Sequence, residues 1–182
     1  MPDNTTDPTS STTAVADLSV GHWTLDPAAS SVGIRHKSMW GMVTVTGSFT
    51  RLSGEGEIGP EGTGHGTLVV DAASIDTKKA KLDTHLRSAD FFDVANHPNF
   101  TFTATGVTPG ADGNATVTGD LTVLGTTRPL SFTARATAAG TTDVTLTGEV
   151  VVNRDDFGMG WNRMGMLKGL TTVVLNTRFT RG

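Results

Sequence analysis

Residues 74–102 read SIDTKKAKLDTHLRSADFFDVANHPNFTF, and here the strand-like alternation of the chain gives way to a helical pattern. The apolar positions of that pattern approximate one stripe of a helix, formed by Ala80, Leu82, Leu86 and Ala89. Asp76 or Thr77 can cap its start, and Pro98 ends it because the residue before a proline resists helical geometry. The stretch therefore predicts one short α-helix, over about residues 77–90, in a chain that otherwise alternates like β-strands.

Period-2 alternation dominates the rest of the chain. In residues 31–38, Val32, Ile34 and His36 fall on one face, which predicts a strand with one apolar side. Comparable patterns occur at residues 42–49, 66–73, 99–105, 115–124, 130–136, 144–152 and 170–179, and a shorter first strand is expected at residues 22–26. Hairpin-length loops join most of them, which gives eight main antiparallel strands and some weaker pieces. Residues 51–58 are interrupted by glycines and are expected to form a weak, edge-like strand.

Eight antiparallel strands can close into a barrel that holds one small ligand, although the same alternation would permit a two-sheet sandwich. Many inward positions carry small residues, namely Gly47, Ala72, Ala104, Gly119, Ala134, Ala136 and Gly148. A packed sandwich core needs bulk facing bulk, whereas a barrel lined partly by small residues leaves room for a ligand. The pattern therefore favours an all-β barrel with a cavity, closed at one end by the short helix.

Composition excludes several classes of function. The chain has 182 residues and no cysteine, so disulfides, thiol catalysis and thiolate metal sites are ruled out. Its net charge is −4 and its 14 basic residues are scattered, which argues against nucleic acid as the main partner. No apolar run approaches the length needed to cross a membrane as a helix.

The N-terminal segment differs in composition from the rest. Residues 1–16 are rich in Thr, Ser, Asp and Pro, and they lack the basic start and apolar centre of a signal peptide. We therefore expect residues 1–20 to be a disordered tail and residues 21–182 to form a single domain. On this interpretation the protein is cytoplasmic, rather than periplasmic or secreted.

Two loops are unusually apolar. Residues 39–42 read MWGM, and residues 153–167 carry three Met, one Trp and one Phe among glycines. Flexible methionines form adaptable apolar surface, which suits ligands without a fixed shape. These loops can line the mouth of a cavity or plug one end of the barrel, and the sequence leaves both interpretations open.

Histidines and carboxylates do not form a recognisable catalytic or metal motif. Asp83 and His85 are two apart, a spacing that points them to different sides of a helix, and nothing makes three ligands converge. Asp83 and Arg87 have the i,i+4 spacing of a helical ion pair. No nucleophile-elbow motif is present. We therefore predict no metal, no cofactor and no catalytic residue, with His36 as a polar group inside an apolar pocket.

A set of short motifs points to a known family. They are WTLDP (23–27) with SSV (30–32), GSF (47–49), SIDT (74–77), DTHLRSADFFDV (83–94), HPNFTF (97–102), GDLTVLGTTRP (119–129) and NRDDFGM (153–159). In this order they resemble the YceI-like family, bacterial lipocalin-like proteins that bind polyisoprenoids. The resemblance implies an eight-stranded antiparallel lipocalin-like barrel with a helix over one end and a long apolar lumen. It also implies a polyprenyl or isoprenoid-quinone-like ligand, often a homodimer, and no established catalytic residues.

The expected function is binding or carriage of an apolar small molecule, most simply a polyisoprenoid or isoprenoid-quinone-like lipid. The expected ligand-binding residues are Ile34, His36, Trp40, Met42, Val43, Val45, Leu68, Val70, Phe100, Phe102, Leu121, Val123, Phe132, Arg154, Met159, Trp161, Met164 and Met166. His36, Arg154 and Arg163 are candidates for contact with a polar head group. Two alternatives stay open, an enzyme that uses His36 as acid or base in the same lumen and a ligand-free structural domain.

Overall fold

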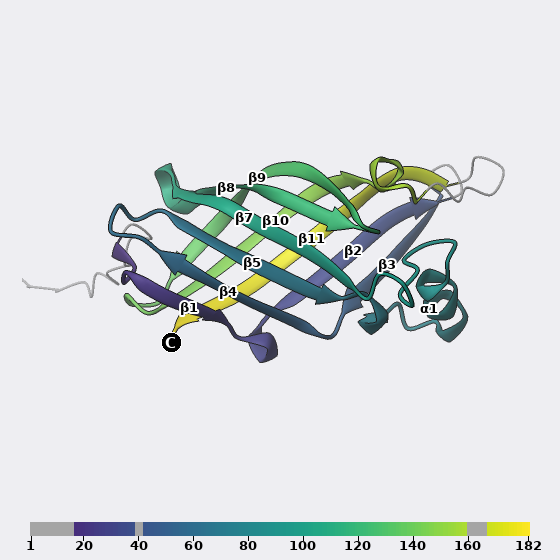
Figure 1. Ribbon diagram of the computed structural model, residues 1–182, viewed down its shortest axis with the longest axis horizontal. Helices are drawn as coiled ribbons and strands as arrows, with labels where there is room; N and C mark the ends of the chain where they lie inside the picture. Colours follow the sequence, from purple (N-terminus) through teal and green to yellow (C-terminus); the bar gives the residue numbers. More distant parts are fainter. Residues whose placement is uncertain (1–16, 39–41, 160–166) are drawn as a thin grey trace, which may run out of the picture.

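The computed structural model describes residues 17–38, 42–159 and 167–182. In these residues the strands form one antiparallel sheet that closes on itself, and a single α-helix lies at one end (Figure 1). The strands are β1 (Gly21–Leu25), β2 (Ser31–Ser38), β3 (Val43–Phe49), β4 (Leu52–Ile58), β5 (Gly64–Asp71), β6 (Ile75–Asp76), β7 (Asn99–Pro109), β8 (Asn114–Val123), β9 (Thr126–Ala138), β10 (Asp143–Asn153) and β11 (Leu167–Arg181). The helices are α1 (Ala80–Arg87) and the 3-10 turns η2 (Pro27–Ala29), η4 (Ala72–Ser74), η5 (Ala111–Gly113) and η6 (Arg154–Phe157).

The described strands make an eight-stranded barrel because two positions in the ring are each occupied by two consecutive short strands. β1 and β2 follow one another around η2, and both pair with β11. β3 and β4 follow one another and pair with β2 and β1 respectively. The ring then continues through β5, β7, β8, β9 and β10 back to β11. Closure of this ring excludes the sandwich and confirms the predicted eight-stranded antiparallel barrel.

Side chains fix both breaks. At η2, the Asp26 carboxylate accepts a hydrogen bond from the backbone N–H of Ala28 at 3.1 Å, and Pro27 begins the turn. Between β3 and β4, the buried Ser74 hydroxyl accepts from the backbone N–H groups of Thr50 and Arg51, each at 3.1 Å. These local hydrogen bonds replace ladder bonds where the strands change direction.

β4 is not the weak edge strand that its glycines predicted. It pairs with β1 on one side and with β5 on the other. A Cβ on Gly56 would lie 2.8 Å from the His65 carbonyl oxygen, and one on Gly54 would lie 3.2 Å from the Leu25 Cβ. The prediction was wrong because these glycines allow close approach of the neighbouring strands instead of marking a poorly packed strand.

The predicted helix is present but shorter than residues 77–90. α1 begins at Ala80 because Lys78 adopts a left-handed φ of 64°. The Asp83 carboxylate turns back to accept from the backbone N–H of Thr77 at 2.9 Å and from its hydroxyl at 2.6 Å. Arg87 donates to the carbonyl oxygens of Ala73 at 2.9 Å and Ile75 at 3.0 Å. Asp83 and Arg87 thus anchor α1 to β6 and η4, in place of the helical ion pair that their spacing predicted.

The two ends of the barrel have separate apolar clusters. Near α1, Leu86, Phe91 and Phe92 pack into a core with inward residues of the strands. The other cluster includes Leu18 and Trp23, and the Trp23 indole N–H donates to the Ser19 carbonyl at 3.0 Å. Leu18 and Ser19, which the composition placed in the tail, therefore contact the barrel, since Leu18 is 8% exposed and the Ser19 backbone N–H donates to the Thr141 carbonyl at 2.8 Å.

Candidate ligand-binding cavity

The barrel encloses a cavity of about 400 Å³ beside α1. Its wall comes from inward positions of β2, β3, β5 and β7–β11, and α1 together with the segment after it closes the end through Leu82, Leu86, Phe91 and Phe92. Alternation places these side chains, because every second residue of a barrel strand points into the lumen. The volume falls in the range of small-molecule sites.

A cluster of three phenylalanines lies where α1 meets the strands. The Phe92 ring packs edge-on against the Phe100 ring with centroids 5.0 Å apart, and Phe49 packs against Phe100 at 5.6 Å. All three line the cavity. Edge-to-face pairs add directional preference to hydrophobic burial, so this cluster fixes the segment after the helix against the barrel wall.

His36 and Thr171 are a polar pair in this apolar wall. They lie opposite one another on β2 and β11, with the His36 Nδ1 atom 2.8 Å from the Thr171 hydroxyl oxygen. The His36 Nε2 atom is buried and has no hydrogen-bond partner among the described residues. Burial lowers the pKa of His36, and the positive charge of Arg154 lowers it further, against a smaller opposite effect of a backbone hydrogen bond at Leu170. His36 is therefore neutral at pH 7.

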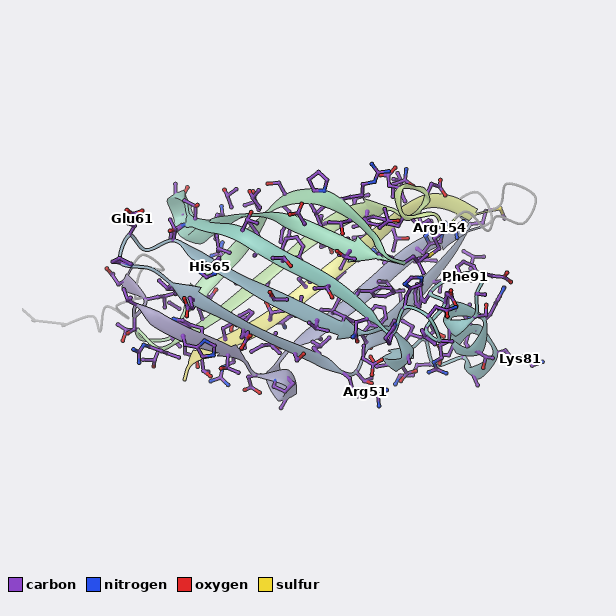
Figure 2. The ribbon with its side chains drawn as sticks, in the orientation of Figure 1. Arg51, Glu61, His65, Lys81, Phe91 and Arg154 are labelled. Atoms are coloured by element: carbon purple, nitrogen blue, oxygen red, sulfur yellow. The ribbon has the colours of Figure 1, made fainter. Side chains whose placement is uncertain are left out.

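Arg154 brings a positive charge to the same cavity from η6. Arg154 is 7% exposed. Burial lowers the pKa of its guanidinium, whereas the negative charge of Asp155 raises it. The guanidinium carbon lies 5.7 Å from the centre of the Phe91 ring, which is a cation–π distance. Figure 2 shows Arg154 and Phe91 together at the α1 end, opposite Glu61. The cavity thus combines a long apolar wall with a cationic group and a neutral imidazole.

A smaller cavity of about 160 Å³ lies toward the opposite end of the barrel. Its wall includes Trp23, Val144 and Leu146, and it shares Leu68, Phe102, Phe132 and Leu175 with the larger cavity. The larger volume is referred to below as the α1-side cavity and the smaller one as the far cavity.

Comparison with known proteins places this geometry in a family. The model of the YceI-like domain matches residues 23–179, from β1 to the last strand. The chain belongs to the YceI-like family. Among curated relatives, a UPF0312 protein of Vibrio campbellii is 32% identical over 121 residues, which cover 65% of this chain and 64% of the relative. The chain spans less than two thirds of the length of the curated relatives that it matches first.

Solved structures share the fold of this YceI-like chain. Burkholderia cenocepacia BcnA superposes with a TM-score of 0.77 at 22% identity, over 85% of this chain and 98% of that one. A polyisoprenoid binding domain from Saccharophagus degradans, implicated in plant cell wall breakdown, gives a TM-score of 0.70 at 17% identity, over 88% and 98% of the two chains. At these identities the likeness establishes the shared barrel architecture.

Most of the residues expected to bind ligand line the α1-side cavity. They are Ile34, His36, Val45, Leu68, Val70, Phe100, Phe102, Leu121, Val123, Phe132, Arg154 and Met159. Trp40, Trp161, Arg163, Met164 and Met166 lie outside the described residues. Their contact with a ligand remains a prediction.

Met42 and Val43 do not line either cavity. Met42 is 82% exposed and Val43 is 40% exposed. Val43 is the first residue of β3 and pairs with Ser38 at the very end of β2. Its alternation gave it the same face as Val45, but the strand end extends beyond the enclosed part of the lumen, so the face points to solvent there.

Several wall residues were absent from the expected binding set. Val150, Val152, Val173 and Leu175 line the cavity, and the alternation in residues 144–152 and 170–179 puts each pair on one face of its strand. The contribution of the segment after α1 was harder to see, because Phe91 and Phe92 follow the helical pattern and belong to none of the alternating segments. These two residues hold the helix against the barrel and also form the end wall of the cavity.

The part of the chain that the structure describes contains neither a cluster of metal-ligating side chains nor a membrane-spanning helix. Among residues 17–38, 42–159 and 167–182, no three His, Asp or Glu side chains are grouped closely enough to hold a metal ion. In the same part of the chain, no helix has the length and apolarity required to cross a bilayer.

Proposed function

We propose that the protein binds a chain-like isoprenoid lipid inside the barrel, such as a polyprenyl compound or an isoprenoid quinone, and carries it without chemical change. The observation that supports this most strongly is the enclosed α1-side cavity of about 400 Å³, whose described wall is apolar apart from a few polar groups. An apolar cavity of this kind is poorly hydrated and favours hydrocarbon. Membership of the YceI-like family and the fold shared with a polyisoprenoid binding domain support the isoprenoid class.

The energetics of such binding are adequate. Each buried CH₂ group contributes about 0.8 kcal/mol, so two or three isoprene units would supply about 8–12 kcal/mol. Loss of translational and rotational freedom and ordering of the chain remove several kcal/mol of this. Affinities of about micromolar order follow, which suit reversible carriage.

A polar head group would lie near Arg154 and His36. A guanidinium donates hydrogen bonds to the oxygen atoms of a carbonyl or phosphate, and the imidazole Nε2 is a further donor or acceptor, depending on the tautomer. Both residues line the α1-side cavity. This arrangement supports a ligand with one oxygen-bearing end and one hydrocarbon end.

Native mass spectrometry of freshly purified protein tests the proposal directly. We expect a co-purifying lipid, or uptake of an added prenyl quinone by protein from which lipid has been removed. Val150→Phe would fill part of the cavity and reduce uptake, whereas Val151→Phe is the matched control because Val151 is 57% exposed on the same strand. No bound lipid and no uptake would support the ligand-free structural alternative and refute carriage.

Catalysis in the same lumen is the remaining alternative, and His36 is the observation that favours it. His36 lies in the cavity wall and is held by Thr171, as an acid or base would need to be. If the protein altered a prenyl substrate, His36→Ala would abolish turnover. Recovery of the ligand chemically unchanged after prolonged incubation supports carriage.

A further inference from the structure

The lumen of this YceI-like barrel is divided by side chains from strands around the ring. Leu68 on β5, Phe102 on β7, Phe132 on β9 and Leu175 on β11 are wall residues of both the α1-side cavity and the far cavity. Because the four strands are spread around the barrel, these residues form a belt between the two volumes. An apolar chain that runs the length of the lumen must pass through this belt.

Two aromatic rings narrow the belt. The Phe102 and Phe132 rings are tilted by 50° with their centroids 5.9 Å apart, although β8 separates their strands. Between them on β8 is Gly119, which pairs with Ala104 of β7 and Leu130 of β9. A Cβ at Gly119 would lie 2.9 Å from the Phe102 Cζ atom. The missing side chain therefore leaves the space in which Phe102 reaches across β8 toward Phe132.

We propose that Phe102 and Phe132 form a partition that determines the length of isoprenoid chain the barrel accepts. This inference rests on the proposed function. Chains short enough for the α1-side cavity of about 400 Å³ bind with the two rings in place. A longer chain gains the far cavity of about 160 Å³ only by displacing the rings from one another. The partition thus sets the length beyond which additional isoprene units no longer strengthen binding.

Removal of one ring tests the partition. Phe132→Ala joins the two cavities, while Leu130→Ala is the matched control because Leu130 is on the same face of β9 but lines only the α1-side cavity. Calorimetric titration with geraniol, farnesol and geranylgeraniol gives Kd against chain length for lipid-free protein. Each newly buried CH₂ strengthens binding about fourfold, so after ordering costs one extra isoprene unit should give about a tenfold gain or more.

The expected result is a change in the slope with chain length. In the wild type, affinity should level off after the chain fills the α1-side cavity. In Phe132→Ala, geraniol should bind more weakly because a wall ring of the α1-side cavity is lost, whereas the ratio of geranylgeraniol to geraniol affinity should rise at least about tenfold over the wild type. Leu130→Ala should weaken all three alcohols alike. An unchanged ratio of geranylgeraniol to geraniol affinity in Phe132→Ala would overturn the partition, and failure of the wild type to bind any of them would overturn the proposed function itself.

Trp23 provides a second readout that reports the position of the chain. It is 3% exposed and lines the far cavity. The sequence has three tryptophans, so replacement of Trp40 and Trp161 by Phe leaves Trp23 as the reporter. A prenyl alcohol brominated at its tail should quench Trp23 in Phe132→Ala, or in the milder Phe132→Leu if the alanine variant fails to fold. Equal quenching of Trp23 in the protein that keeps Phe132 would refute the role of the partition in limiting chain length.

Discussion

Ser74→Ala should destabilise the protein through the junction that holds the helix end of the barrel. Ser74 is 6% exposed, and its hydroxyl accepts from the backbone N–H groups of Thr50 and Arg51 while donating to the Asp71 carbonyl at 2.7 Å. One hydroxyl thus joins the break between β3 and β4 to the end of β5. The next residue, Ile75, is 1% exposed and pairs with Phe49 of the aromatic cluster.

The size of the effect follows from the groups left behind. The Thr50 N–H keeps a second acceptor, the Ser74 carbonyl at 3.2 Å, so the main losses fall on the Arg51 N–H and the Asp71 carbonyl. A buried polar group without its partner costs about 1–3 kcal/mol, and partial access to water reduces the cost for Arg51. We expect a total loss of about 2–3 kcal/mol in the free energy of unfolding, or about 4–12 °C in Tm for a chain of this size.

Urea unfolding followed by far-UV circular dichroism measures this loss as a shift in midpoint at constant slope. Ser131→Ala is the matched control, because Ser131 is exposed on β9 and its hydroxyl donates to the Val117 carbonyl at 3.2 Å. That variant should change stability by less than about 0.5 kcal/mol. If Ser74→Ala and Ser131→Ala differ by less than about 0.5 kcal/mol, water or a local shift replaces the hydroxyl and the reasoning fails.

Three further predictions concern other parts of the molecule. Because burial lowers the pKa of His36 from 6.5 in the fold, the unfolded chain takes up its proton first as pH falls; stability is therefore full above about pH 6.5 and declines below it. His36→Asn should flatten that part of a urea-midpoint profile, and an identical profile would contradict the assignment. Arg87→Lys should lower the free energy of unfolding by about 1–2 kcal/mol and speed hydrogen exchange over residues 80–94, because an ammonium does not reproduce the two hydrogen bonds that the guanidinium donates to the Ala73 and Ile75 carbonyls. Lys81→Ala, at an exposed position of the same helix, should change neither quantity. Gly119→Ala would overlap the Thr103 carbonyl oxygen and should lower the free energy of unfolding by about 3 kcal/mol, whereas Gly106→Ala, with no atom within 4 Å of the added Cβ, should be tolerated; equal melting temperatures for the two variants would disprove this.

Sequence reasoning was most reliable where one local rule decides the outcome. Alternation gave the correct face for Ile34, His36 and Phe132 because successive side chains of a strand point to opposite sides of the sheet. It failed at Val43 because a face becomes a cavity wall only within the closed part of the barrel. The predicted helix length was wrong because contacts outside the helical pattern set its start. The left-handed backbone of Lys78 and the hydrogen bond from Thr77 to Asp83 move the start of α1 to Ala80.

The glycines of the strands show the limit of local reasoning most clearly. A glycine in a strand can mark a weak edge of the sheet or a place where a neighbouring segment packs closely. Only the position of that neighbouring segment in the fold distinguishes the two cases. Gly56 in β4 belongs to the second kind, with the His65 backbone against it. Gly119 also belongs to it, with the Phe102 ring in the space that a side chain would otherwise fill.

The sequence by itself determined that the chain forms antiparallel strands with one apolar face, one short helix and no cysteine chemistry, because these properties depend on residue type and local spacing. Only the tertiary structure decided that two of the eight barrel strands are broken and that Arg154 is buried with its guanidinium beside the Phe91 ring. It also decided that Phe102 and Phe132 meet across β8 to divide the lumen. Those features depend on closure and register of the barrel, which bring together residues far apart in the chain at distances that no local pattern specifies.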